Sequence, residues 1–203
     1  NMMAVWLFEE VKKLLDSLPH EVVGYVKEKT VFTSDQIKQM EQMVHGMNLE
    51  INREGNIAQF AGYFSLQEID WTFYKEKYGD IQRMDRILKA EGLSPDKYQL
   101  AKQADSLMTF YNLSKVRIDE ILADLNYQVP ENYFEKTLRY YLQRTSHGST
   151  LSRVVHTKLA DMAGDHSLSW RFYQESLFSD YRDIQGGTTG EGIHTGVMAA
   201  TIY

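Results

Sequence analysis

The sequence predicts an all-α protein, and three observations lead to this prediction. Apolar residues recur three and four positions apart along most of the 203 residues, which is the spacing of amphipathic helices. No convincing run alternates apolar and polar residues as a half-buried strand would; residues 49–55, "LEINREG", could form a short strand or hairpin arm. Each of the three prolines, Pro19, Pro95 and Pro130, lies just before or early in a helical pattern. We therefore expect roughly ten helices joined by short connections.

The first half of the chain shows three strong helix signals. An apolar stripe predicts a helix over residues 2–18. Residues 33–47 predict a second, capped by Thr33 or Ser34. Residues 65–79 predict a third, with Ser65 and Glu68 as a capping box.

The remaining helices follow with short connections. A helix over residues 81–92 is expected to end at Gly92. Pro95 is expected to start a helix that runs through residue 113, and Ser114 starts the next. The last four helices are expected over residues 130–141, 150–162, 167–181 and 191–202.

Composition narrows the class of protein. The net charge is −6 with both signs interspersed, which argues against a nucleic-acid-binding surface. No apolar run approaches the roughly 18 residues of a membrane span. The chain contains no cysteine, so it has no disulfide framework and no thiolate metal site. Together with the absence of a signal peptide, this leads us to expect a cytoplasmic protein with a single domain over residues 1–203.

Residues 147–153, "HGSTLSR", open directly into a helical pattern. In one interpretation Ser149 or Thr150 simply caps that helix after a glycine turn. In the other, the helix N-terminus and the hydroxyl groups bind an anion, with His147 and Gly148 in the same loop.

Residues 185–194, "QGGTTGEGIH", permit the same two interpretations. Thr188 or Thr189 can cap a helix, and glycines such as Gly187 let the backbone approach a ligand closely. Two such loops could converge on one tetrahedral anion. Neither is a Walker loop, because no Gly-Lys-Ser/Thr follows.

Other polar residues give weaker signals. Lys102 and Gln103 lie within the helix expected from Pro95, either solvated or directed into a pocket where they would bind sugar hydroxyls. The histidines lack the spacing of a helical zinc site, and His156 is expected in the core. No catalytic carboxylate pair is evident: Asp70, Asp105, Asp183 and Glu191 are explained as caps, ion-pair partners or solvated residues. Trp71 is expected in the core or as a sugar-stacking platform.

Two segments closely resemble the end of the catalytic domain of glycoside hydrolase family 65. They are "TSHGSTLSRVVH" at 145–156 and "DIQGGTTGEGIHTGVMAAT" at 183–201. Family-like segments at 59–64, 70–88 and 98–111 precede them in the expected order. The family comprises inverting phosphorylases of disaccharides such as maltose, trehalose and kojibiose, together with some hydrolases.

The resemblance implies a fold, a site and an activity. The fold would be roughly the second half of an (α/α)6 barrel. His147, Gly148, Ser149, Thr150, Gly187, Thr188 and Thr189 would hold phosphate, and Lys102 and Gln103 would hold the glucosyl unit. Inorganic phosphate would be the co-substrate, with no cofactor and no metal. The general acid would be a glutamate upstream of Asn1, so this chain is expected to be inactive alone and to self-associate through exposed barrel surfaces.

Two departures and two alternatives accompany the resemblance. Ala61 stands where an acidic residue is expected, and Ala200 stands where a glycine is expected. The glycine-rich loops look more like those of kojibiose and trehalose phosphorylases than those of maltose enzymes. The alternatives to a phosphorylase are a family 65 hydrolase and a non-catalytic helical carbohydrate-binding remnant.

Overall fold

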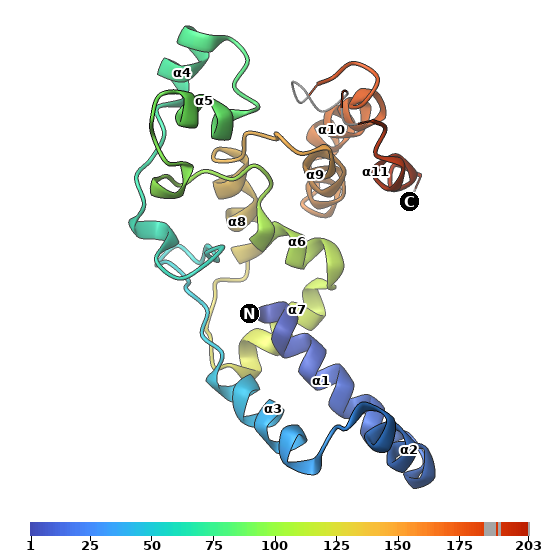
Figure 1. The fold of residues 1–203 in the computed structure, drawn as a ribbon. Coiled ribbons are helices and arrows are strands. Elements are labelled where there is room, and N and C mark those ends of the chain that lie inside the picture. The colour runs from blue at the N-terminus through green and yellow to red at the C-terminus, as the bar shows by residue number, and fades with distance from the viewer. Residues whose placement is uncertain (185–189, 191, 203) are drawn as a thin grey trace. The chain divides into compact units, whose positions relative to one another are not determined.

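The structure is a computed structural model that describes residues 1–184, 190 and 192–202. Within these residues it is all-α, as predicted, and its only extended pairings are three isolated bridges (Figure 1). The chain forms two compact units, one of residues 1–49 and 113–129, the other of residues 50–112 and 130–203. No helix in the described part of the chain is long and apolar enough to cross a membrane. The expectation of a single domain over residues 1–203 stays a prediction.

The first unit is built around a long amphipathic helix. Its helices are α1 (Met2–Ser17), α2 (His20–Thr30), α3 (Ser34–Gly46) and α7 (Lys115–Asp124). α1 packs against α3 and α7, and Val5, Val44 and Ile118 are buried on these helices. Thr33 is the cap of α3, because its hydroxyl accepts from the Gln36 amide at 3.2 Å.

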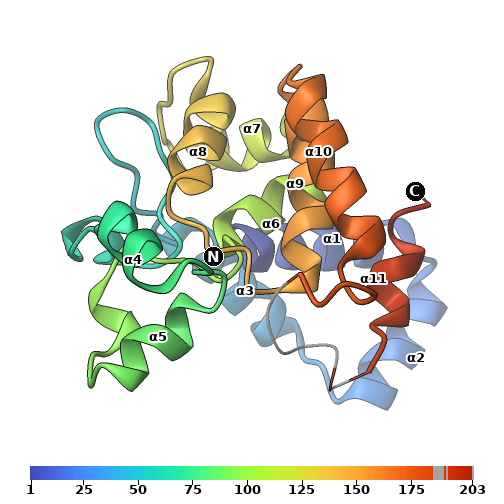
Figure 2. The same cartoon turned by 90° about the horizontal axis from the view of Figure 1, so that it is seen from above.

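The second unit contains the remaining elements. They are the 3-10 helices Tyr63–Ser65 and Pro95–Lys97, and the helices α4 (Trp71–Tyr78), α5 (Met84–Ala90), α6 (Asp105–Asn112), α8 (Tyr133–Leu142), α9 (Thr150–Met162), α10 (His166–Phe178) and α11 (Thr195–Ala199). α9 packs along α10 and against α6, and Figure 2 shows α9 and α10 side by side. Leu107, Leu159 and Phe172 are buried on these three helices.

The capping box expected at Ser65 and Glu68 is wrong. Ser65 closes a 3-10 turn and donates its hydroxyl to the Gly62 carbonyl at 2.6 Å. Glu68 instead pairs with Arg144. The helix begins at Trp71, and Asp70 caps it by accepting from the Phe73 amide at 3.0 Å.

The long helix expected from Pro95 to residue 113 is also wrong. Pro95 starts only a 3-10 turn, and α6 begins at Asp105. Between them the backbone bonds to distant segments: Gln99 N–H donates to the Gln67 carbonyl at 2.7 Å. Lys102 and Gln103 therefore lie in a bend before α6, not in a helix. At the other end of the chain, α11 is shorter than expected, since it covers only Thr195–Ala199.

Candidate functional site

A backbone bridge places two of the predicted binding segments beside each other. Ala101 pairs in parallel with Thr145: Ala101 N–H donates to the Arg144 carbonyl and Ser146 N–H donates to the Ala101 carbonyl, both at 2.8 Å. Because the pairing is parallel, the two segments continue from the bridge in the same direction. The residues that follow Ala101, predicted to bind sugar, therefore start alongside the residues that follow Thr145, predicted to bind phosphate.

The His147–Thr150 loop runs against the segment that connects α4 to α5. Gly148 is buried there, and a Cβ at this position would clash with the Gln82 carbonyl oxygen and lie 3.2 Å from Arg83 Cδ. Only glycine fits this approach without a shift of the backbone. Gly148 thus has a packing role that fixes the path of the loop.

The helix cap at the end of this loop leaves its hydroxyl unused. Ser149 occupies the N-cap position of α9, which begins at Thr150, but its side chain makes no cap hydrogen bond. Ser149 is half-buried and Thr150 is buried. Because the first turn of a helix presents N–H groups with no intrahelical partner, this end of α9 has donors suited to an anion.

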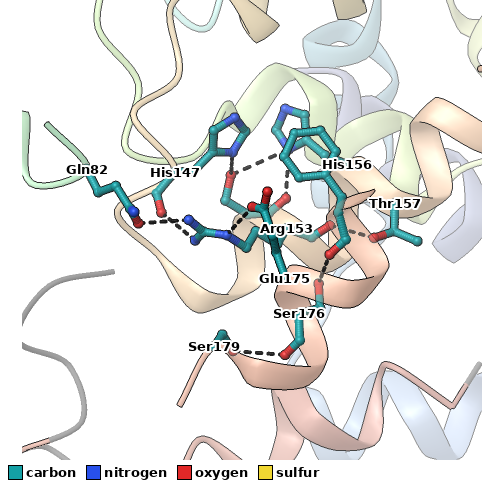
Figure 3. A network of polar contacts seen from close by, with 10 residues as sticks. Gln82, His147, Arg153, His156, Thr157, Glu175, Ser176 and Ser179 are labelled. Carbon is teal, nitrogen blue, oxygen red and sulfur yellow. Dashed lines mark hydrogen bonds and ion pairs between the residues drawn. The ribbon is translucent and has the colours of Figure 1, made fainter. Parts of the chain in front are cut away.

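His147 is neutral and half-buried beside a second histidine. Its backbone is left-handed, with φ +54°, and its ring packs 4.7 Å from that of His156 and 5.0 Å from that of Phe172 (Figure 3). Burial lowers the pKa of His147 to about 2, with His156 and Arg153 adding to the effect. At neutral pH this side chain is therefore a hydrogen-bonding group, not a cation.

The hydrogen bonds around Ser152 are compatible with a His147 tautomer that carries its proton on Nε2. His156 Nδ1 lies 2.7 Å from the Ser152 carbonyl oxygen, which can only accept, so Nδ1 carries the proton. The Ser152 hydroxyl lies 3.0 Å from His147 Nδ1. When that hydroxyl donates, neutral His147 carries its proton on Nε2, and this N–H is a donor for a ligand oxygen.

His156 lies in the core, as expected, with 1% of its surface exposed. Burial lowers its pKa to about 4. Its Nε2 is buried and has no hydrogen-bond partner in the described part of the chain.

Arg153 holds the loop in place, and the sequence did not single it out. It is 3% exposed, and its guanidinium donates to the His147 carbonyl at 2.9 Å, to Gln82 Oε1 at 2.7 Å and to Glu175 Oε2 at 2.9 Å (Figure 3). A cation in the first turns of a helix opposes the helix dipole. That unfavourable position was the one local signal of a special role.

Lys102 lies near the same loop but is exposed. Its charge acts on Asp85: burial alone would raise the pKa of that carboxyl, but the Arg83 guanidinium at 3.1 Å holds it below its usual value, and Lys102 adds to the lowering. Lys102 makes no ion pair with any described residue, whereas Arg83 and Arg153 are paired. It is therefore a cation beside the loop that is available to a ligand.

The second predicted loop cannot be located in the same way. Gly187, Thr188 and Thr189 lie outside the described residues, so the convergence of the two loops stays a prediction. The chain on either side is joined by Asp180, whose buried carboxylate accepts from the His194 amide at 2.7 Å and lies 3.0 Å from His194 Nδ1. α11, which follows His194, contacts α9.

Other candidate chemistry is not assembled in the described residues. They include no cluster of three histidine, aspartate or glutamate side chains able to hold a metal ion. Trp71 packs against the cluster of Ile69, Tyr74, Met84 and Leu88, which accounts for it as a core residue. Glu191 lies outside the described part of the chain.

Comparison with known proteins supports the fold. A solved structure described as a kojibiose phosphorylase from the human microbiome matches 98% of this chain with a TM-score of 0.72 and 23% identity. At that identity the match shows the fold, and it supports assignment to part of an (α/α)6 barrel.

Curated relatives give higher identities. A trehalose 6-phosphate phosphorylase from Lactococcus lactis is 50% identical over 76% of this chain. An uncharacterised glycosyl hydrolase from Mycobacterium tuberculosis is 43% identical over the whole chain. The chain spans 20% of the length of the first relative and 15% of the second. The model of the glycosyl hydrolase family 65 central catalytic domain matches residues 1–203, and the chain belongs to this family.

Proposed function

We propose that this chain provides the phosphate-binding and glucosyl-binding part of an inverting disaccharide phosphorylase. The observation that supports this most is the bridge between Ala101 and Thr145, which sets the Lys102–Gln103 segment beside the His147–Thr150 loop. The Lys102 cation and the Gln103 amide are suited to the hydroxyls of a glucosyl unit, and the neighbouring N-terminus of α9 is suited to an anion. The family membership agrees with this combination.

The proposed reaction needs few catalytic groups. A phosphate oxygen attacks the anomeric carbon from the face opposite the leaving sugar, and the bond from that carbon to the glycosidic oxygen breaks. A general acid protonates the departing oxygen; we expect it to be a glutamate supplied from outside this chain. Phosphate is itself the nucleophile, so the second carboxylate of an inverting hydrolase is unnecessary. An α-linked glucosyl disaccharide would yield β-glucose 1-phosphate and the released sugar.

The role of the chain would then be to position both reactants. The Ser149 and Thr150 hydroxyls, the first amides of α9 and the Nε2–H of neutral His147 would hold phosphate, with Gly187, Thr188 and Thr189 completing the cradle. Lys102 and Gln103 would hold the glucosyl hydroxyls. Fixed donors around the nucleophile lower the entropic cost of aligning it with the anomeric carbon. Inorganic phosphate would be a co-substrate, and we propose no cofactor.

We propose kojibiose, trehalose or a phosphorylated form of such a disaccharide as the substrate. The names of the relatives guide this choice: one is a trehalose 6-phosphate phosphorylase, and another, 26% identical, is a kojibiose phosphorylase from Caldanaerobacter subterraneus.

The test is turnover by the full-length protein that carries this chain. Each disaccharide is supplied with and without inorganic phosphate, and glucose 1-phosphate and free sugar are measured. We expect sugar release only with phosphate, with one glucose 1-phosphate formed for each bond cleaved. Turnover that is equal without phosphate would replace the proposal with a hydrolase. Saccharide binding without any turnover would replace it with a carbohydrate-binding protein.

The matched variants are Ser149→Ala and Ser179→Ala. Ser149 belongs to the proposed cradle, whereas the buried Ser179 donates its hydroxyl to the Ser176 carbonyl at 3.0 Å. We expect Ser149→Ala to raise the KM for phosphate several-fold and Ser179→Ala to leave it unchanged. Equal KM values in the two variants would remove Ser149 from the cradle.

A further inference from the structure

A polar cavity that is open to solvent lies in the unit that contains α8. Its volume is about 820 Å³. It is formed by the C-terminal part of α8, the turn at residues 52–56 and the chain around residues 64–68 and 99. The charged side chains that line it are Arg53, Lys136, Arg139, Arg144, Glu54 and Glu68. Cations thus outnumber carboxylates here, although the chain as a whole has a net charge of −6.

Three of the four cations in this cavity are unpaired. Arg144 is occupied, since it pairs with Glu68 at 2.6 Å and its guanidinium lies 3.8 Å from the centre of the Tyr140 ring. Arg53, Lys136 and Arg139 make no ion pair with any described residue, and all three line the same cavity. Unpaired cations gathered in a concavity attract an anion more strongly than the same charges on a flat surface.

The neutral part of the wall is suited to hydroxyl groups. Asn56 lines the cavity and is 2% exposed, yet its Oδ1 is buried without a hydrogen-bond partner among the described residues. A buried amide oxygen left in this state is costly, and a turn of the side chain towards the cavity would let a ligand hydroxyl satisfy it. The Asn56 backbone is fixed, because its N–H donates to Asn52 Oδ1 at 2.9 Å.

The opposite wall is held rigidly. Gln99 donates its side-chain amide to the Leu66 carbonyl at 2.9 Å, and the Tyr140 hydroxyl donates to Gln99 Oε1. The Tyr140 ring packs edge-on against Phe64 at 5.6 Å. The cavity therefore combines fixed aromatic and amide groups with unpaired cations.

We infer that this cavity binds a phosphorylated sugar, with Arg139, Lys136 and Arg53 around the phosphoryl group and the Asn56 amide on a sugar hydroxyl. Inorganic phosphate alone would leave the Asn56 oxygen unsatisfied. A nucleic acid requires a continuous basic stripe, whereas Glu54 and Glu68 lie among the cations that line this cavity. The inference goes beyond the proposed function, because it requires binding only and concerns residues outside the proposed phosphate cradle.

The experiment is calorimetric titration of the chain with three probes: glucose 6-phosphate, glucose and inorganic phosphate. We expect glucose 6-phosphate to bind more tightly than either of the others and to weaken as salt is added. Arg139→Gln and Lys136→Gln should each reduce its affinity about tenfold, which is the typical loss when a hydrogen bond to a charged group is removed. Lys38→Gln, an exposed lysine of α3, is the matched control and should have no effect.

Two further variants distinguish this cavity from the proposed phosphate cradle. Ser149→Ala should leave glucose 6-phosphate binding in the cavity unchanged. Asn56→Ala should weaken glucose 6-phosphate but not inorganic phosphate, and its circular dichroism spectrum checks that it folds. The inference is overturned if, in the Ser149→Ala variant whose proposed phosphate cradle is weakened, glucose 6-phosphate binds no more tightly than inorganic phosphate, or if Arg139→Gln and Lys136→Gln bind it as the unaltered chain does.

Discussion

Arg153 joins three segments that are far apart in the sequence, through the His147 carbonyl, the Gln82 amide and the Glu175 carboxylate. Each bond uses a different nitrogen of the planar guanidinium, a geometry that lysine cannot reproduce. Its contribution could not be predicted from the sequence, because two of its partners lie 71 and 22 residues away.

We therefore expect Arg153→Lys to destabilise the chain. The charge near Glu175 is kept, but at least one buried polar partner is left unsatisfied, at a cost of about 1–3 kcal/mol in the free energy of unfolding. Urea denaturation measures this change. The control is Arg86→Lys at an exposed position, which should stay within about 0.5 kcal/mol of the unaltered chain. Equal midpoints for the two variants would show that Arg153 does not hold the loop.

The buried His156 and the half-buried His147 should make stability depend on pH. Burial lowers the pKa of His147 to about 2 and of His156 to about 4, from an unfolded value near 6.5. Below pH 6.5 the unfolded chain binds protons that the folded chain does not, so the free energy of unfolding falls as the pH is lowered from 6.5 towards 4. The slope should approach about 1.4 kcal/mol per pH unit for each histidine.

Urea denaturation between pH 7.5 and 4.5 tests this prediction. His156→Leu should reduce the slope, because one of the two histidines no longer takes up a proton on unfolding. His45→Gln, at an exposed position of α3, is the control and should retain the slope. An unchanged slope in His156→Leu would contradict the assignment of a buried neutral imidazole.

At the scale of elements, the sequence predicted those structures whose signals are local. α9 begins and ends where the pattern over 150–162 indicates, because its period and its start signal lie within the helix itself. The helix expected from Pro95 failed for the opposite reason. Backbone groups of Gln99 and Ala101 bond to Gln67 and Arg144, and no local pattern reveals such partners.

The approach of the loop to the α4–α5 connection gives a prediction at this scale. Gly148→Ala places a methyl group against the Gln82 carbonyl, so it should lower the free energy of unfolding by about 1–3 kcal/mol, as overpacking does. Gly24→Ala is the matched control: Gly24 lies inside α2 with nothing within 4 Å of the added carbon. That substitution should stabilise the chain by about 0.5–1 kcal/mol. Thermal melting of both variants shows whether Gly148→Ala lowers the stability and Gly24→Ala raises it. An unchanged stability of Gly148→Ala would show that the loop can move away from Gln82.

At the scale of the whole molecule, the sequence predicted the all-α class and, through its resemblance, the family. A backbone bridge between Ala101 and Thr145 joins the two segments that precede Lys102–Gln103 and the His147–Thr150 loop, and the binding roles of these residues stay predictions. The sequence did not reveal the division into two compact units or the cationic cavity on α8. Both arise from long-range contacts between segments whose local patterns are ordinary.

Apolar side chains on α1 give a prediction for the chain as a whole. Leu14 is 57% exposed and Leu7 is 50% exposed on the same helix. Clustered exposed apolar groups favour association, so we expect the 203-residue chain to sediment as a concentration-dependent oligomer. Leu14→Glu should shift it towards the monomer. Gln39→Glu adds the same charge at an exposed position of α3 and should leave the oligomer unchanged. Sedimentation of the unaltered chain as a monomer at every concentration would contradict the expectation.

The bridge between Ala101 and Thr145 is formed by main-chain hydrogen bonds, and the only side chain that adds to it in the described residues is the Ser146 hydroxyl, which donates to the Ala101 carbonyl at 3.5 Å. Mutation can therefore exchange the amino acids that follow Ala101 without disturbing the alignment of the two backbone segments. Under the proposed function, evolution can in this way alter the choice of saccharide while the neighbouring His147–Thr150 loop is inherited unchanged. A lineage of enzymes can diversify in what it cleaves and keep a common way of cleaving it.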